Sequence, residues 1–301
     1  MTLILGSLQL GLIYSLLAMG IYISFRILNT PDLTAEGSFT LGMAVMTVLV
    51  VAGHPFVGIF FALAAGALAG LVTALLQTKL RIPPILAGIL TMTGLYTINL
   101  MVMGGSSNVT LLGVNSIFDL IANVLPFAYN ISKIIVSVLI ALIMIVLMVL
   151  FFKTNCGLCI RAIGDNEKMA RASSMNVDGY KIIGLMVSNG LIALCGGLIA
   201  CDQGYADMTS GSGMLVVGLA AVIIGEAFIR RRTILAGMVS CVLGSIVYRF
   251  ILAAAISTRI FPAYAMKLLS AIIVTIALAI PAVRYYRENY ELKKRDGHAG
   301  N

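Results

Sequence analysis

Long apolar runs, each suited to crossing a membrane, recur along this chain and restrict its fold more than any other feature. A helix needs about 20 mostly apolar residues to cross a bilayer. Nine candidate runs lie at 3–25, 38–52, 55–78, the first half of 82–118, 134–152, 182–201, 214–229, 234–255 and 268–283. Eight or ten spans are the alternatives, because a short piece can be re-entrant or merely buried. We predict an all-α fold, a polytopic transmembrane helical bundle of about nine spans.

The composition agrees with a chain that lies almost entirely in the membrane. Of its 301 residues, 60% are hydrophobic and 11% are charged, whereas soluble domains carry about 25% charged residues. These values exclude a water-soluble globular enzyme, a disordered chain and a disulfide-stapled secreted module. Small residues at helical spacing, among them Gly66 with Gly70 and Ala193 with Gly197, predict closely packed helices.

The distribution of Lys and Arg predicts an orientation, because cytoplasmic loops of membrane proteins are enriched in both. With nine crossings and an outside N-terminus, 16 of the 20 basic residues are cytoplasmic, in Arg26, Lys79, Arg81, the segment 153–181, Arg230 to Arg232 and the tail. The net charge of +8 therefore reflects membrane topology, and we expect lipid contact and no nucleic acid. We predict one transmembrane domain over 1–285, with a cytoplasmic loop at 153–181, and a basic cytoplasmic tail over 286–301. The first run is interpreted as a retained span.

Residues suited to catalysis or metal binding are scarce. His54 and His298 are far apart in the sequence, and Cys156 and Cys159 form a C-x-x-C pair with no second pair nearby to complete a zinc site. The patterns of intramembrane proteases and lipid-phosphate transferases are absent from the sequence. We predict no catalytic residue, no metal and no cofactor.

The segment between Arg161 and Lys181 is helical in pattern but too polar for a span. Asp165 or Asn166 suits the N-cap of a short helix, and Glu167 and Arg171 are spaced for an i, i+4 ion pair. Met169, Ala172 and Met175 would share one face. Asn176 suits the left-handed residue that ends a helix, and Asp178 would cap the next one. Because so short a helix is marginal in water, it is either an amphipathic connector or a docking helix for a cytoplasmic partner.

The run RAIGDNEKMARASSMNV at 161–177 resembles the cytoplasmic loop of permease subunits in bacterial ATP-driven importers of the branched-chain amino acid and ribose type. In that family a pattern R-A-x-G-x-N-x-x-x-A-x-x-x-G-[IV]-N/D precedes a span rich in small residues. The chain matches at Arg161, Ala162, Gly164, Asn166, Ala170, Asn176 and Val177, and departs at Ser173, Ser174 and Met175. Segments 192–200 and 217–226 resemble the two family segments that follow.

The resemblance implies a transport subunit of the bacterial inner (plasma) membrane and not an enzyme. A second permease subunit, a copy of this chain, would complete the pathway. A cytoplasmic ABC ATPase dimer would hydrolyse ATP, and an extracytoplasmic substrate-binding (lipo)protein would deliver the solute. The loop would be the coupling helix, with ATPase contacts at Asp165, Asn166, Glu167, Lys168, Met169, Arg171, Met175 and Asn176. The segments 10–20 and 32–38 resemble those of one subgroup of this family. That resemblance implies amino-acid-like solutes, aromatic ones included.

Polar residues in or beside the spans are candidates for the pathway, because such residues are costly in lipid. Asp32 and Glu36 lie in a polar break before the second span, where helix capping in a cytoplasmic loop is the alternative role. Asn99 and Asn189 lie within spans and would otherwise form interhelical hydrogen bonds. Asp202 and Gln203 are expected at the outer surface, where the binding protein would dock. For Glu226 we expect a local ion pair with Arg230 to Arg232.

A stand-alone ion-coupled secondary transporter is the alternative function. Such a transporter would have inverted repeats with two broken helices at matching positions, and only the break near Pro31 is visible. The sequence also lacks the P-loop motif G-x-x-x-x-G-K-[ST], since it contains no Gly-Lys dipeptide. A chain that works with ATP therefore needs an ATPase on another polypeptide.

Overall fold

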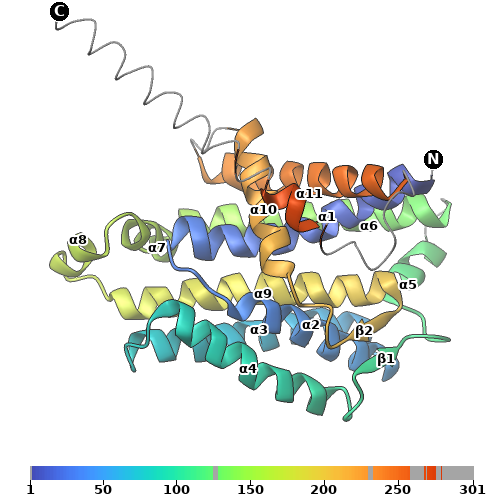
Figure 1. Ribbon diagram of the computed structural model, residues 1–301, viewed down its shortest axis with the longest axis horizontal. Helices are drawn as coiled ribbons and strands as arrows, with labels where there is room; N and C mark the ends of the chain where they lie inside the picture. The colour runs from blue at the N-terminus through green and yellow to red at the C-terminus, as the bar shows by residue number, and fades with distance from the viewer. Residues whose placement is uncertain are drawn as a thin grey trace, which may run out of the picture.

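The computed structural model describes residues 2–124, 128–229 and 233–257, together with 268, 270–275 and 279. Within them the chain is a bundle in which most of the long helices run side by side along one long axis (Figure 1). The first half comprises α1 (Thr2–Ile21), η1 (Tyr22–Ile27), α2 (Thr34–Val51), α3 (Pro55–Thr78), α4 (Pro84–Val102), β1 (Asn108–Thr110) and α5 (Ile117–Val124). The second half comprises α6 (Tyr129–Lys153), α7 (Asn155–Asp165), α8 (Glu167–Ala172), α9 (Val177–Gln203), β2 (Tyr205–Asp207), α10 (Met214–Phe228) and α11 (Ile234–Ser257).

Seven helices of the described part are long and apolar enough to cross a membrane. They are Ile4–Ile27, Thr34–Val51, Pro55–Thr78, Pro84–Val102, Tyr129–Lys153, Val177–Gln203 and Ile234–Ser257. The expected span at 214–229 is the shorter apolar helix α10, and most of the expected span at 268–283 lies outside the described residues. The prediction of a polytopic all-α bundle is confirmed.

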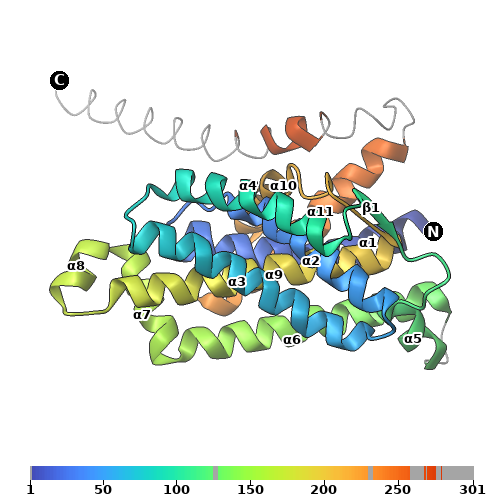
Figure 2. The same ribbon diagram turned by 90° about the horizontal axis from the view of Figure 1, so that it is seen from below.

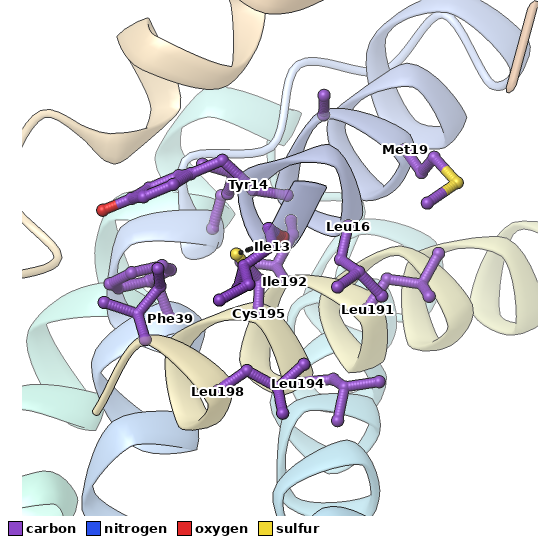
Figure 3. Packing of buried hydrophobic residues seen from close by; sticks show 14 of the residues in the cluster. Ile13, Tyr14, Leu16, Met19, Phe39, Leu191, Ile192, Leu194, Cys195 and Leu198 are labelled. Carbon is purple, nitrogen blue, oxygen red and sulfur yellow. Dashed lines mark hydrogen bonds between the residues drawn. The ribbon is translucent and has the colours of Figure 1, made fainter. Parts of the chain in front are cut away.

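The core of the bundle is formed by α1, α2 and α9, and the other spans surround it. In the α9 span 78% of the most apolar window is buried, against 28% in the α6 span. In both views α9 runs through the middle of the molecule, and in Figure 2 α6 runs along the edge of the molecule. Figure 3 shows the packing of α1 on α9, where the Cys195 thiol donates to the Ile13 carbonyl at 3.2 Å.

Small residues let α3 and α9 approach closely, as their spacing in the sequence predicts. A methyl group added at Gly66 would lie 2.4 Å from the backbone oxygen of Asn189, closer than atoms can pack. At Gly70 the same addition would meet the backbone oxygen of Leu185 at 2.3 Å. The two backbones are therefore in contact, which fixes the position of α9 against α3.

The two ends of the bundle differ in structure. At one end α7 and α8 project beyond the spans, while α5 and the two-stranded ribbon of β1 and β2 lie at the other (Figure 1). The ribbon is antiparallel, with Val109 opposite Ala206, and β1 lies within 104–131, a stretch that contains no Lys or Arg. The end with α7 and α8 carries the basic loop 153–181. We call these the cytoplasmic and outer ends, in keeping with the charge distribution.

Candidate functional site

Of the two N-cap candidates in the sequence, Asp165 and Asn166, it is Asn166 that caps the short helix α8. The Asn166 side chain accepts a hydrogen bond from the Met169 N–H at 3.1 Å, which satisfies one of the free donors at the helix start. Ala170 is buried against Ile163 of α7 and Val177 of α9, and this packing attaches α8 to the rest of the protein. Met169, about 100° around the helix from Ala170, leaves 52% of its surface exposed. The helix therefore presents an outward surface with an apolar centre.

The boundaries of α8 differ from the expectation in two respects. The helix ends at Ala172, and the left-handed residue after it is Ser174, with φ of 58°, not Asn176. Asn176 instead caps α9, where its Oδ1 accepts from the Gly179 N–H at 3.1 Å. Asp178, expected to be that cap, lies inside the first turn of α9. An Asn at either place satisfies local backbone groups, so the sequence alone did not separate a helix end from a helix start.

Ion pairs tie α8 to the start of α9. Arg171 donates to Glu167 at 3.0 Å, the expected i, i+4 pair, and also to Asp178 of α9 at 3.1 Å. Lys181 of α9 donates to Glu167 at 2.7 Å. The Lys181 hydrogen bond, with the one from Arg171, holds the pKa of Glu167 below its usual range despite partial burial. Each exposed pair contributes only about 0–1 kcal/mol, so the network chiefly fixes the orientation of α8.

The other side of the loop is packed against the first span. Gly164, near the end of α7, lies so close to η1 that an added methyl group would be 1.7 Å from the Ile27 carbonyl oxygen. Besides its direct connection to the end of α6, the segment from α7 to α9 is thus joined to the bundle at two places, by Gly164 on η1 and by α9 itself. A force on α8 would reach the buried core through both contacts.

A buried polar network links the break after η1 to α9. Asp32 is 1% exposed, and its carboxylate accepts from the Thr34 N–H at 2.9 Å and from Asn189 Nδ2 at 2.6 Å. Ser38 donates to Asn189 Oδ1 at 2.7 Å. Asp32 therefore binds the first turn of α2 and a side chain of α9 at once, which combines the capping role with an interhelical one.

Asn99 and Glu36, the other two pathway candidates, lie apart from this network. Asn99 of α4 is buried and donates to the Gly37 carbonyl at 3.3 Å. Glu36 accepts from the Gly213 N–H at 2.9 Å and so joins α2 to the start of α10. Neither contact tests a role in the pathway, which stays a prediction for all four residues.

The two outer candidates occupy different environments. Asp202 is half-buried and accepts from Gln9 at 2.7 Å and from Lys133 at 3.1 Å, so it joins α1, α6 and α9. Gln203 is exposed. Of the two, Gln203 is the one that a docking protein could reach directly.

Glu226 pairs with a distant residue. Arg26 donates to its carboxylate at 2.6 Å, across 200 positions of sequence. The expected local partners Arg230 to Arg232 lie outside the described residues. The pair joins the end of α10 to η1, which agrees with a cytoplasmic position for both.

A cavity of about 680 Å³ lies between α1, α2, α10 and α11 toward the outer end. Its wall includes Gln203, Tyr205, Thr209, Tyr14, Phe39 and Arg249. Arg249 is not among the predicted site residues, although it is a lone arginine inside the apolar run 234–255. Its neighbours in the cavity could not be predicted, because Tyr14 and Phe39 come from other helices.

Comparisons with known proteins agree with this architecture. A family model described as branched-chain amino acid transport system, permease component, matches residues 3–278. The chain belongs to this family. It is therefore a permease of the ABC-importer type and a multi-pass protein of the inner membrane.

Curated relatives extend over most of the chain. A protein named tyrosine transport system permease protein, from Clostridioides difficile, is 37% identical over 270 residues, 89% of this chain and 88% of the relative. An uncharacterized protein from Rickettsia prowazekii is 35% identical over 93% of this chain and 98% of its own length. The autoinducer 2 import system permease protein LsrC from an Enterobacter species is 30% identical over 72% of this chain and 63% of its own length. No solved structure matches the chain.

Proposed function

We propose that this chain forms, with a second copy of itself, the translocation pathway of an ABC importer for an amino-acid-like solute, in particular an aromatic one. An external binding protein delivers the solute, and a separate cytoplasmic ATPase dimer drives transport. The name of the Clostridioides difficile relative supports an aromatic amino acid, because tyrosine is the solute printed in it.

The observation that carries the proposal is the attachment of α8. A helix that transmits the ATP-driven closure of an ATPase dimer must keep its orientation when force is applied to it. The Asn166 cap, the buried Ala170 and the pairs from Glu167 and Arg171 to α9 supply that rigidity. The exposed Met169 supplies an apolar contact for the groove of a partner.

A motion of α8 would be transmitted through α9 to the buried core of the bundle. α9 continues directly from the loop and packs most extensively on α3 and α2. Since α3 and α9 touch through their backbones at Gly66, a displacement of α9 shifts its neighbours as well. Packed helices of this kind move as rigid bodies.

Uptake by liposomes that contain the purified complex tests the proposal. The full chain is purified from its native membrane to identify the ATPase and binding protein that accompany it, and the complex is placed in liposomes. We expect uptake of L-tyrosine or L-phenylalanine that requires ATP and the binding protein. Uptake that follows an ion gradient and ignores ATP would overturn the proposal in favour of a secondary transporter.

A further inference from the structure

The outer cavity contains an arginine without an acidic partner in the described residues. No salt bridge reaches Arg249 there, and its buried Nε donates no hydrogen bond. The residues that line the cavity include no Asp or Glu. Charged groups within membrane spans usually pair with one another or mark a path for substrate or ions. The positive charge of Arg249 is thus available to an anionic ligand that enters the cavity.

Aromatic rings hold the arginine in place and give the cavity an apolar side. The Arg249 guanidinium carbon lies 3.6 Å from the centre of the Tyr14 ring, a cation–π contact. Tyr14 in turn stacks with Phe39, with ring centres 6.4 Å apart and planes inclined by 19°. Figure 3 shows Tyr14 and Phe39 close together beside the packed core. The Tyr14 ring orients the Arg249 guanidinium and covers one of its faces. The N–H groups at the edge of the guanidinium remain as donors for a ligand oxygen.

The rest of the wall is uncharged and combines apolar side chains, such as Ile199, Val217 and Leu252, with polar ones. It carries the hydroxyl groups of Tyr205, Thr209, Ser210 and Ser212 and the Gln203 amide. Tyr205 and Thr209 are exposed, so the cavity is open to the outer side. Opposite, Tyr248 and Ser270 hydrogen-bond through their oxygens at 2.6 Å and close the wall. The volume of about 680 Å³ lies within the range of small-molecule sites.

We propose that this cavity is a binding site for the transported solute, in which Arg249 binds the carboxylate of the solute. A guanidinium binds a carboxylate through two parallel N–H···O bonds, and the Tyr14–Phe39 stack offers an apolar surface to the rest of the solute. The solute class is an acid with an adjoining apolar or aromatic group. This inference rests on the proposed import function, which supplies the solute from the outer side.

Protection of Arg249 from an arginine reagent tests the inference on the purified full chain. Phenylglyoxal modification at each arginine is followed by mass spectrometry with 3-phenylpropionate, L-phenylalanine or phenethylamine present. We expect both acids to slow modification of Arg249 and the amine to leave it unchanged, with exposed Arg161 unaffected by all three. Equal rates with and without the acids, or equal protection by the amine, would overturn the inference.

Variants supply a second readout. In Arg249→Gln, binding of 3-phenylpropionate measured by NMR saturation transfer should weaken on the order of tenfold to a hundredfold, the cost of losing a charge-assisted hydrogen-bonded pair. Arg249→Lys should recover only part of it, since an ammonium lacks the planar fork. Lys133→Gln removes another cation toward the outer end, one that is paired with Asp202, and should leave acid binding unchanged. Unaltered affinity in Arg249→Gln would refute the assignment.

The two proposals fail in different experiments. Protection of Arg249 by the acids needs neither ATP nor the partner proteins. A lack of protection therefore overturns only the proposed carboxylate-binding site. Loss of ATP dependence in uptake overturns the importer proposal alone. If Arg249→Gln does not fold, as judged by thermal unfolding, the protection measurement on the unaltered chain still decides the matter.

Discussion

Gly164 provides the sharpest test of how the loop is attached to the bundle. In Gly164→Ala the new methyl group would lie 1.7 Å from the Ile27 carbonyl oxygen, whereas ordinary contact begins near 3.4 Å. The obstacle is backbone, so it cannot turn aside as a flexible side chain would. The end of α7 and η1 must therefore separate by about 1.7 Å, and both are continuous with spans.

A matched substitution isolates this clash. Gly94 lies within α4, and a methyl group there meets nothing within 4 Å. Gly94→Ala should therefore stabilise the protein by at most about 1 kcal/mol through helix propensity. Gly164→Ala carries the same gain against an overpacking cost of about 1–3 kcal/mol. We expect it to be less stable than Gly94→Ala by about 1–3 kcal/mol.

The cysteines of the chain make the measurement direct. Cys195, Cys201 and Cys241 are buried, so a thiol-reactive fluorescent dye reports unfolding of the purified protein in detergent as temperature rises. Gly164→Ala should unfold at a lower temperature than Gly94→Ala and support less ATP-driven uptake per molecule. Equal unfolding temperatures for the two variants would show that α7 does not rest on η1 in this way.

Two further predictions concern the polar groups around α9. Asp32→Ala removes the acceptor of the Thr34 N–H and one of the two acceptors of Asn189 Nδ2, which keeps its bond to the Leu185 carbonyl. It should lower the free energy of unfolding by about 1–3 kcal/mol per buried donor left unpaired, and thermal unfolding should show a smaller loss for Ser38→Ala. Glu167 has a lowered pKa, so its contribution to holding α8 is present above the usual glutamate pKa of about 4.3 and is lost as the pH falls below it. Hydrogen exchange over 166–175 should therefore show more frequent opening as the pH is lowered from 7 to 3, after correction for intrinsic rates, with most of the change below about pH 4.3, and Glu167→Gln should remove that change.

The sequence predicted those features that depend on local pattern. Apolar runs located the seven spans in the described residues, and local pattern narrowed the α8 cap to Asp165 or Asn166 and located the Glu167–Arg171 pair. The contacts it missed join residues far apart in the chain. Arg26 and Glu226 are 200 positions apart, and Arg249 meets Tyr14 only because α11 packs on α1. Such pairs depend on which helices become neighbours, and residue spacing within one segment carries no information on that.

The central claim is that α8 transmits the action of an ATPase, and Met169→Asp tests it most directly. The side chain is 52% exposed, so the substitution should leave thermal unfolding unchanged while placing a charge in the proposed apolar contact. Leu112→Asp, at an exposed apolar residue in the loop after β1 (87% exposed), is the control. We predict that Met169→Asp loses both co-purification of the ATPase and ATP-driven uptake, and that Leu112→Asp keeps the ATPase. Intact complex formation and uptake in Met169→Asp would contradict the account.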